Sequence, residues 1–158
     1  MRTPLLLALL LAGCGSAGAA LPADAVILQG STVPAMMHQC SRAVPPAGES
    51  TWQPDAEAIA ALEAALLAAL RAGRPSDDNE LANAPRGWRR QYVGIVRGGR
   101  RMIYGNFFPT DPRANAMMGD RWRREPTIIC DGGPVSFGVE YDVAARRFSH
   151  IAFNGSLG

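Results

Sequence analysis

Gln91-Tyr92-Val93-Gly94-Ile95-Val96 and Val135-Ser136-Phe137-Gly138-Val139-Glu140-Tyr141 are the stretches of this sequence that decide its fold. Both are short, rich in β-branched and aromatic residues, and bounded by glycine, proline and aspartate, which is typical of strands. In the second stretch apolar and polar residues alternate, so we expect one face to be buried and Glu140 and Asp142 to meet water. Similar runs recur between residues 88 and 154, and they predict an antiparallel sheet.

The predicted strands follow one another along the chain. Residues 90–97 and 100–108 flank Gly98-Gly99, a pair that permits the positive φ angles of a two-residue hairpin turn. The remaining predicted strands are residues 127–131, 135–142 and 147–153, and the last two are joined by a turn at 143–146. A brief apolar run at 26–28 is a further candidate for an edge strand.

A helical pattern covers residues 54–72, ahead of these strands. Pro54 suits a first-turn position, Asp55 complements the positive end of the helix dipole, and Gly73 provides a stop. An apolar stripe with spacings of three or four consists of Ile59, Leu62, Leu66 and Leu70. The sequence therefore predicts an α+β domain, in which one N-terminal helix packs on a four- to five-stranded antiparallel meander.

Length and composition are those of one small domain. The chain has 158 residues, of which 47% are hydrophobic, and this is enough for a packed core. The formal net charge of +2 is too small to indicate a polyanionic partner by itself.

The N-terminus has the organisation of an export signal. Arg2 supplies a positive charge, and residues 5–12 form an apolar run that is shorter than the roughly 20 residues needed to span a bilayer. The run ends in Leu11-Ala12-Gly13-Cys14, which resembles the lipobox of bacterial lipoprotein precursors position for position. The resemblance implies a signal peptide over residues 1–13 and diacylglycerol and acyl chains, such as palmitate, on Cys14.

This resemblance also implies a location and a division of the chain. Lipid on Cys14 makes the membrane a partner, and Gly15, which is not aspartate, implies the outer membrane, with the protein facing the periplasm. Residues 14–50 would then be a tether and N-terminal segment, and residues 51–158 the α+β domain. The alternative is an ordinary secretory signal, for which Ala17-Gly18-Ala19 offers a cleavage site.

The sequence contains three cysteines, an odd number that needs explaining in an exported protein. If Cys14 carries lipid, Cys40 and Cys130 remain as an even pair in an oxidising compartment, and we expect them to form a disulfide. The alternative is a pair of buried free thiols.

Charge is distributed unevenly. Between residues 86 and 124 there are ten arginines and two acidic residues, with two tryptophans interleaved. In an exported protein, an anionic envelope component or an acidic protein face suits arginine better than nucleic acid does. The candidate contact residues are Trp88, Arg97, Arg100, Arg101, Trp122, Arg123 and Arg124. The alternative is that these arginines are solvated faces of edge strands.

Two other activities have weaker support in the sequence. Asp131, Glu140 and His150 would form an envelope hydrolase site if their strands converged. Gln91-Tyr92-Val93-Gly94 is similar to the Gln-x-Val-x-Gly hairpin motif of cystatin-like inhibitors, but the glycine comes one residue early.

Residues 36–38, Met-Met-His, lie near Cys40 without the several convergent ligands that a metal site needs. No cofactor motif is present either. We therefore expect a lipid-anchored binding module of the cell envelope, with no catalytic residues, metal or cofactor.

Overall fold

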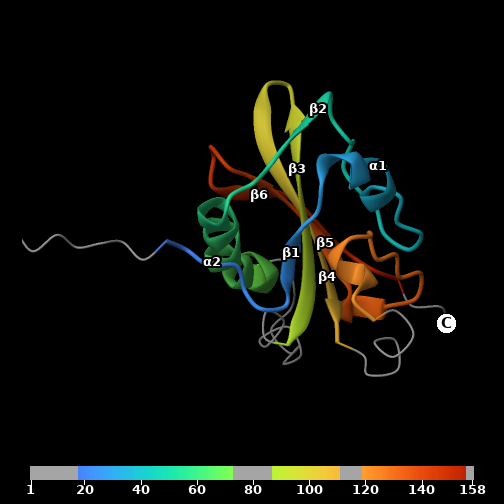
Figure 1. The fold of residues 1–158 in the computed structure, drawn as a ribbon. Helices are drawn as coiled ribbons and strands as arrows, with labels where there is room; N and C mark the ends of the chain where they lie inside the picture. Colours follow the sequence, from blue (N-terminus) through green and yellow to red (C-terminus); the bar gives the residue numbers. More distant parts are fainter. Residues whose placement is uncertain (1–17, 73–86, 111–118, 156–158) are drawn as a thin grey trace, which may run out of the picture.

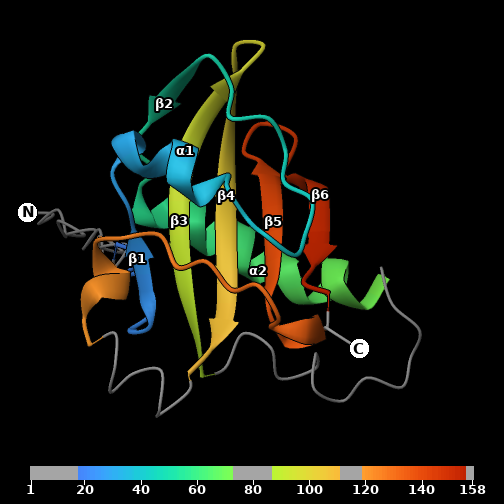
Figure 2. The ribbon, with the colours of Figure 1, turned by 90° about the vertical axis from the view of Figure 1, so that its right-hand side faces the viewer.

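The computed structural model describes residues 18–72, 87–110 and 119–155. One sheet contains six strands: β1 (Ala25–Ile27), β2 (Ser50–Trp52), β3 (Trp88–Arg97), β4 (Arg100–Pro109), β5 (Phe137–Asp142) and β6 (Arg147–Phe153). Their order is β1-β3-β4-β5-β6, and β2 also pairs with β3. A long helix lies on one face of the sheet, and irregular segments cover the other (Figures 1 and 2). The α+β class is thus confirmed, although the sheet has six strands where four to five were predicted.

The β3–β4 hairpin is the centre of the sheet. Its register places Arg97 beside Arg100 at the turn and Trp88 beside Pro109 at the far end. Gly98 and Gly99 form the turn with φ angles of 57° and 71°, left-handed values that both turn residues of this hairpin type require. The predicted hairpin is confirmed.

Strand β5 pairs antiparallel with both β4 and β6, and β6 has the predicted bounds. The predicted strand at residues 127–131 is wrong, because β4 pairs directly with β5 and no strand intervenes. Side chains bind the backbone of this segment instead. Gln91 Oε1 accepts the Thr127 N–H at 2.8 Å, and the Asn106 amide donates to the Thr127 carbonyl at 2.9 Å.

Strands β1 and β2 both come before residue 53 in the chain, and both pair with the outer side of β3. β1 runs parallel to β3, with Ala25 beside Arg90, whereas β2 runs antiparallel, with Ser50 beside Val96. The candidate edge strand at 26–28 therefore exists one residue earlier, and the expectation of a purely antiparallel meander is wrong. Three-residue strands are too short to show an alternating pattern, so β2 left no signal in the sequence.

Helix α2 (Ala56–Ala72) covers one face of the sheet. Asp55 caps it, because its Oδ1 accepts the Ala58 N–H at 2.8 Å. The predicted apolar stripe is buried, and it packs on a sheet face that includes Tyr92, Ile103, Phe107, Phe137, Val139 and Tyr141. No helix in the described ranges is long and apolar enough to cross a lipid bilayer.

The opposite face is covered by two irregular segments, residues 28–49 and 119–136, which we call the cover. The cover contains η1 (Gly30–Thr32), α1 (Val33–Met36), η2 (Arg121–Arg123) and η3 (Gly133–Val135). Its apolar side chains form a second, smaller core with Val93, Ile95, Met102 and Tyr104. The predicted disulfide is confirmed: Cys40 and Cys130, with Cα atoms 5.1 Å apart, join the two segments.

The expected solvent-facing positions of β5 are buried. Glu140 and Asp142 are each only 1% exposed, because the hairpin tip and the cover lie over them. Arg97 pairs with Glu140, and Arg100 pairs with Asp142. The expectation that these carboxylates meet water is therefore wrong, and the alternation of β5 separates an apolar buried face from a polar buried face.

Candidate functional site

The predicted contact residues fall into two groups at opposite ends of the β3–β4 hairpin. Arg97, Arg100 and Arg101 lie at the turn. The η2 residues lie near the other end, where Gln91 donates to the carbonyl of Trp122. Gln91 and Arg97 are six residues apart on one strand, a separation of about 20 Å. The structure thus does not gather the candidates into one surface.

At the hairpin tip, residues 97–101, two of the three candidate arginines are engaged in ion pairs. Arg97 pairs with Glu140 and also donates to the Pro46 carbonyl at 2.8 Å, while Arg100 pairs with Asp142. Arg101 stacks over the Trp52 ring, 5.2 Å from its centroid. The positive charges at the hairpin tip are therefore largely neutralised by acidic residues of the same chain.

The tip also holds an internal anion. The N–H groups of Gly98 and Gly99 donate to the Glu49 carboxylate at 3.1 and 3.0 Å. The bond from Gly99 is the main cause that lowers the pKa of Glu49, although partial desolvation opposes it. The tip is a small anion-binding nest, and Glu49 of the same chain occupies it.

The second group lies at η2, and we call Arg89, Trp122, Arg123 and Arg124 the Trp122 cluster. The guanidinium carbons of Arg89 and Arg123 lie 4.6 and 4.4 Å from the centroid of the Trp122 ring, which is 2% exposed. Arg123 also lies 3.6 Å from exposed Asp120. In the described part of the chain, neither Arg89 nor Arg124 has a carboxylate partner. These arginines retain most of their capacity to bind an anion.

Gln91 fixes η2 against the sheet. Its side chain is fully buried, and its amide nitrogen donates to the carbonyls of Trp122 and Glu125. Its amide oxygen accepts from Thr127 and from Asn106. One strand residue therefore holds both ends of the segment that carries Trp122, Arg123 and Arg124.

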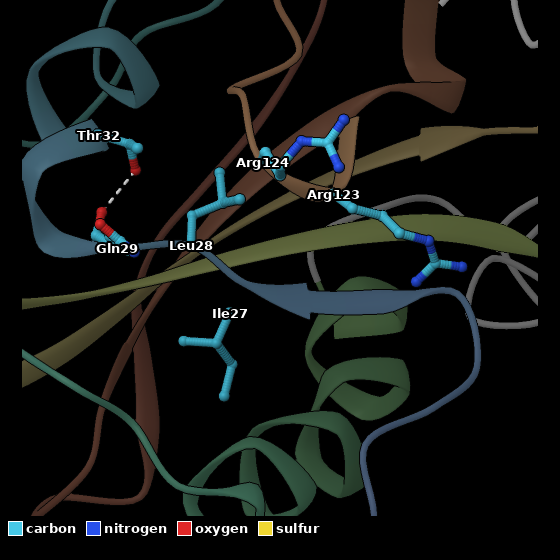
Figure 3. Close-up of a pocket in the computed structure, with 6 residues that line it drawn as sticks. All are labelled: Ile27, Leu28, Gln29, Thr32, Arg123 and Arg124. Atoms are coloured by element: carbon cyan, nitrogen blue, oxygen red, sulfur yellow. Dashed lines mark hydrogen bonds between the residues drawn. The ribbon is translucent and has the colours of Figure 1, made fainter. Parts of the chain in front are cut away.

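A pocket of about 320 Å³ lies beside this cluster. Its lining residues are Ile27, Leu28, Gln29, Thr32, Arg123 and Arg124. Figure 3 shows Leu28 pointing toward Arg124, while Ile27 points away toward the α2 side of the sheet. Thr32 donates its hydroxyl to the Gln29 carbonyl at 2.7 Å, which closes the η1 turn at the rim. The pocket combines apolar walls with two basic side chains.

Trp88, the other interleaved tryptophan, lies on the opposite side of the sheet. It packs against Phe137 in the α2-side core, with ring centroids 5.4 Å apart. Sequence reasoning grouped it with Trp122 because both are surrounded by arginines. The period of a strand, not proximity in sequence, decides which face such a residue occupies.

Of the three residues of the hydrolase hypothesis, Glu140 and His150 lie opposite each other on β5 and β6, but each contacts other groups. Glu140 binds Arg97 and accepts a hydrogen bond from the Ser149 hydroxyl at 2.6 Å. A ring nitrogen of His150 lies 3.1 Å from the Ala43 carbonyl, and Asp131 is exposed. In the part of the chain that the structure describes, no hydrogen bond or ion pair joins Asp131 to the other two.

The structure also places the motif similar to that of cystatins. Gln91-Tyr92-Val93-Gly94 lies within β3, not at a hairpin tip, and the first three residues are fully buried. The Met-Met-His segment is likewise part of the fold, since Met36 is fully buried. Within the described ranges, no three His, Cys, Asp or Glu side chains lie close enough together to hold a metal.

Comparison of the chain with protein families, curated proteins and solved structures finds no match. Sequence reasoning did not select Arg89, although the run of arginines around it was visible. The pocket residues Ile27, Leu28, Gln29 and Thr32 had no signal in the sequence, because they reach η2 only through the parallel pairing of β1 with β3.

Proposed function

We propose that this protein is a lipid-anchored binding module of the bacterial cell envelope that recognises an anionic envelope component through the Trp122 cluster. The observation that carries the proposal is that Arg89 and Arg123 stack on one tryptophan while Arg123 and Arg124 line the adjacent pocket. In the described part of the chain, only Arg123 of these three lies near a carboxylate, that of exposed Asp120. The remaining candidates at the hairpin tip support the fold in this proposal, because their charges are paired internally.

The chemistry of the site favours phosphate or carboxylate groups. A guanidinium offers a planar fork of donors that matches both anions, and stacking on an aromatic ring leaves the edge of that fork free. Arg123 combines this stacking with a position on the pocket lining. The Leu28 side chain, which points toward Arg124, would pack against the nonpolar part of the same ligand.

The anchor is the second part of the proposal. The lipobox-like Leu11-Ala12-Gly13-Cys14 lies outside the described residues, so lipidation of Cys14 and an outer-membrane location facing the periplasm remain predictions from the resemblance. Stable anchoring needs more than one acyl chain, because each buried methylene contributes only about 0.8 kcal/mol. The two or three chains of a lipoprotein N-terminus meet this requirement.

The test compares two triple variants that remove the same charge. Arg89, Arg123 and Arg124 are changed to Gln in one, and exposed Arg101, Arg146 and Arg147 in the other. Binding of the purified, detergent-solubilised protein to lipopolysaccharide and to peptidoglycan is then measured. We expect about a tenfold or greater loss for the first variant, since each charge-assisted hydrogen bond contributes about 1.5–3 kcal/mol. Equal losses in both variants, or no binding by the wild type, would contradict the proposal.

A further inference from the structure

The Trp122 cluster and the start of the described chain lie at the same edge of the sheet. Figure 2 shows η2 and the N-terminal end of the described chain both at the β1 edge, although Figure 1 shows them on opposite faces of the sheet. The connection between them is short. Leu21 packs on the α2-side core, the backbone carbonyl of Asp24 accepts the Arg90 N–H at 2.8 Å, and β1 then leads directly to the pocket.

The proposed anchor restricts how far this edge can move from a membrane. Only six residues separate Cys14 from Leu21, the first side chain packed on the core. A fully extended chain spans at most about 3.6 Å per residue, so the β1 edge stays within about 25 Å of the lipid. The β3–β4 hairpin is itself ten residues long on each strand, about 33 Å, and its tip extends away from η2.

Charge distinguishes this edge from the hairpin tip. Around η2, Arg121 pairs with Glu125 and Arg123 lies near Asp120, while Arg89 and Arg124 remain without acidic partners in the described part of the chain. Asp24, just before β1, is a further acidic residue beside this edge. Among the described residues at this edge, the four arginines therefore outnumber the three acidic residues, and β1 connects this edge to the proposed anchor.

We infer that the β1 edge faces the membrane that holds the anchor, and that Arg89, Arg123 and Arg124 bind the phosphates of anionic lipid headgroups. This inference rests on the proposed function and names the partner of the same site. Basic side chains held near an anionic leaflet are attracted to it, and the attraction decays within the Debye length, about 8 Å at physiological ionic strength. The anchor holds the β1 edge within about three Debye lengths of the lipid, so the cluster meets the membrane repeatedly and the attraction favours each close approach.

The experiment uses the acylated full chain reconstituted into vesicles. A spin label is placed at Gln29→Cys, on the pocket rim, or at Ala144→Cys, in the exposed turn between β5 and β6 at the hairpin-tip end. Collisions with a lipid-borne relaxation agent are measured in phosphatidylcholine vesicles with and without phosphatidylglycerol. We expect severalfold stronger relaxation at position 29 than at 144, an increase with phosphatidylglycerol, and loss of that increase at high salt.

The two triple variants control this measurement. Changing Arg89, Arg123 and Arg124 to Gln should remove the difference between the labels, whereas changing Arg101, Arg146 and Arg147 should preserve it. Equal relaxation at both labels, or the same result in neutral and anionic vesicles, would overturn the inference. If the first triple variant still loses lipopolysaccharide or peptidoglycan binding in that case, the proposed function survives without it. A mature chain that carries no acyl groups would overturn both.

Discussion

The two faces of the sheet are covered by different chemistry. On the α2 side, aliphatic helix residues pack against aromatic strand residues in one apolar core. On the cover side, a small apolar core adjoins buried polar residues, which include Arg42, Gln91, Asn106, Thr127, Glu140, Asp142 and Asn154. An apolar core requires the right volume and pattern, whereas a buried polar layer requires each donor to meet its acceptor. Because each buried donor on the cover side must meet a particular acceptor, the irregular segments are held in one arrangement.

Arg42 is the centre of that polar layer. Its guanidinium donates to Asn154 Oδ1 and Asn106 Oδ1, each at 2.6 Å, and to the Tyr104 hydroxyl at 3.3 Å. These acceptors come from β4 and from the segment that follows β6. One side chain of the first cover segment thus binds the sheet and the C-terminal segment together, through neutral groups that satisfy a buried charge.

The largest expected effect is on the apolar face. Phe107 is fully buried, stacks on Phe137 at 4.7 Å and meets Tyr92 edge-on. Phe107→Ala should lower the free energy of unfolding by about 3–5 kcal/mol, because it removes an aromatic side chain and leaves a cavity. Urea unfolding measures this loss, and Phe107→Leu, which fills more of the space, should lose less. A loss below that of the cover-side variants would refute the view that this face contributes most of the stability.

The disulfide tests the cover as a unit. Replacing both Cys40 and Cys130 by Ser should cost about 2–4 kcal/mol, since the bond closes a loop between residues 90 positions apart. Amide exchange should increase mainly in residues 28–49 and 119–136, while amides of α2 keep most of their protection. Uniform loss of protection on both faces would show that the cover and the apolar core unfold as one unit.

A smaller effect is expected where one side chain holds the site. Gln91→Ala leaves the Thr127 N–H and the carbonyls of Trp122 and Glu125 without their present partner. An unsatisfied buried group costs about 1–3 kcal/mol, and part of this cost is recovered if η2 detaches. We therefore expect a loss of about 2 kcal/mol in urea unfolding together with weaker anion binding.

Gln39→Ala is the matched control for this variant, because in the described part of the chain the Gln39 side chain makes one hydrogen bond, to the Met36 carbonyl at 3.1 Å. It should change stability little and leave anion binding intact. Unchanged anion binding in Gln91→Ala would show that η2 keeps its position without Gln91.

The difference between the apolar face and the cover side also explains which parts of the fold the sequence could predict. Helix α2, the β3–β4 hairpin and β6 carry period and turn signals, and all three were predicted close to their observed bounds. Glu140 and Asp142 alternate with Val139 and Tyr141 as solvent-facing residues would, yet they are buried. The pattern shows that two faces differ, but it cannot show that irregular chain covers the polar one.

The site depends on this unpredictable part. Residues 127–131 read as a strand because most of them are apolar or β-branched, but Gln91 and Asn106 bind the backbone at Thr127 and hold it over one face of the sheet. The pocket brings residues near 28 to residues near 124, and such contacts leave no local pattern in a single sequence. The excess of arginine is visible in the sequence. Which arginines form ion pairs and which do not can be determined only from the structure.

The smallest expected effect concerns a polar group on the apolar face. Glu63 of α2 lies 3.0 Å from Arg90 and accepts the Tyr92 hydroxyl. Burial is the main cause that raises the pKa of Glu63, although the hydrogen bond from Tyr92 and the charge of Arg90 oppose it. A raised pKa means that the folded state binds the proton more tightly than the unfolded state. The stabilising contribution is therefore present below the ordinary glutamate pKa and is lost as pH rises through the raised value.

Glu63→Gln does not titrate, so its free energy of unfolding should decline less than that of the wild type over this pH interval. Urea unfolding at a series of pH values above 4.5, the ordinary pKa of the group, measures the difference between the two curves. Glu57→Gln, at an exposed position of the same helix, controls for the loss of one acidic charge. If the wild type instead gained stability relative to Glu63→Gln as pH rises, Arg90 and Tyr92 would outweigh burial. The contact of Glu63 with Arg90 and Tyr92 would then compensate a buried charge on the apolar face, as the polar contacts on the cover side do.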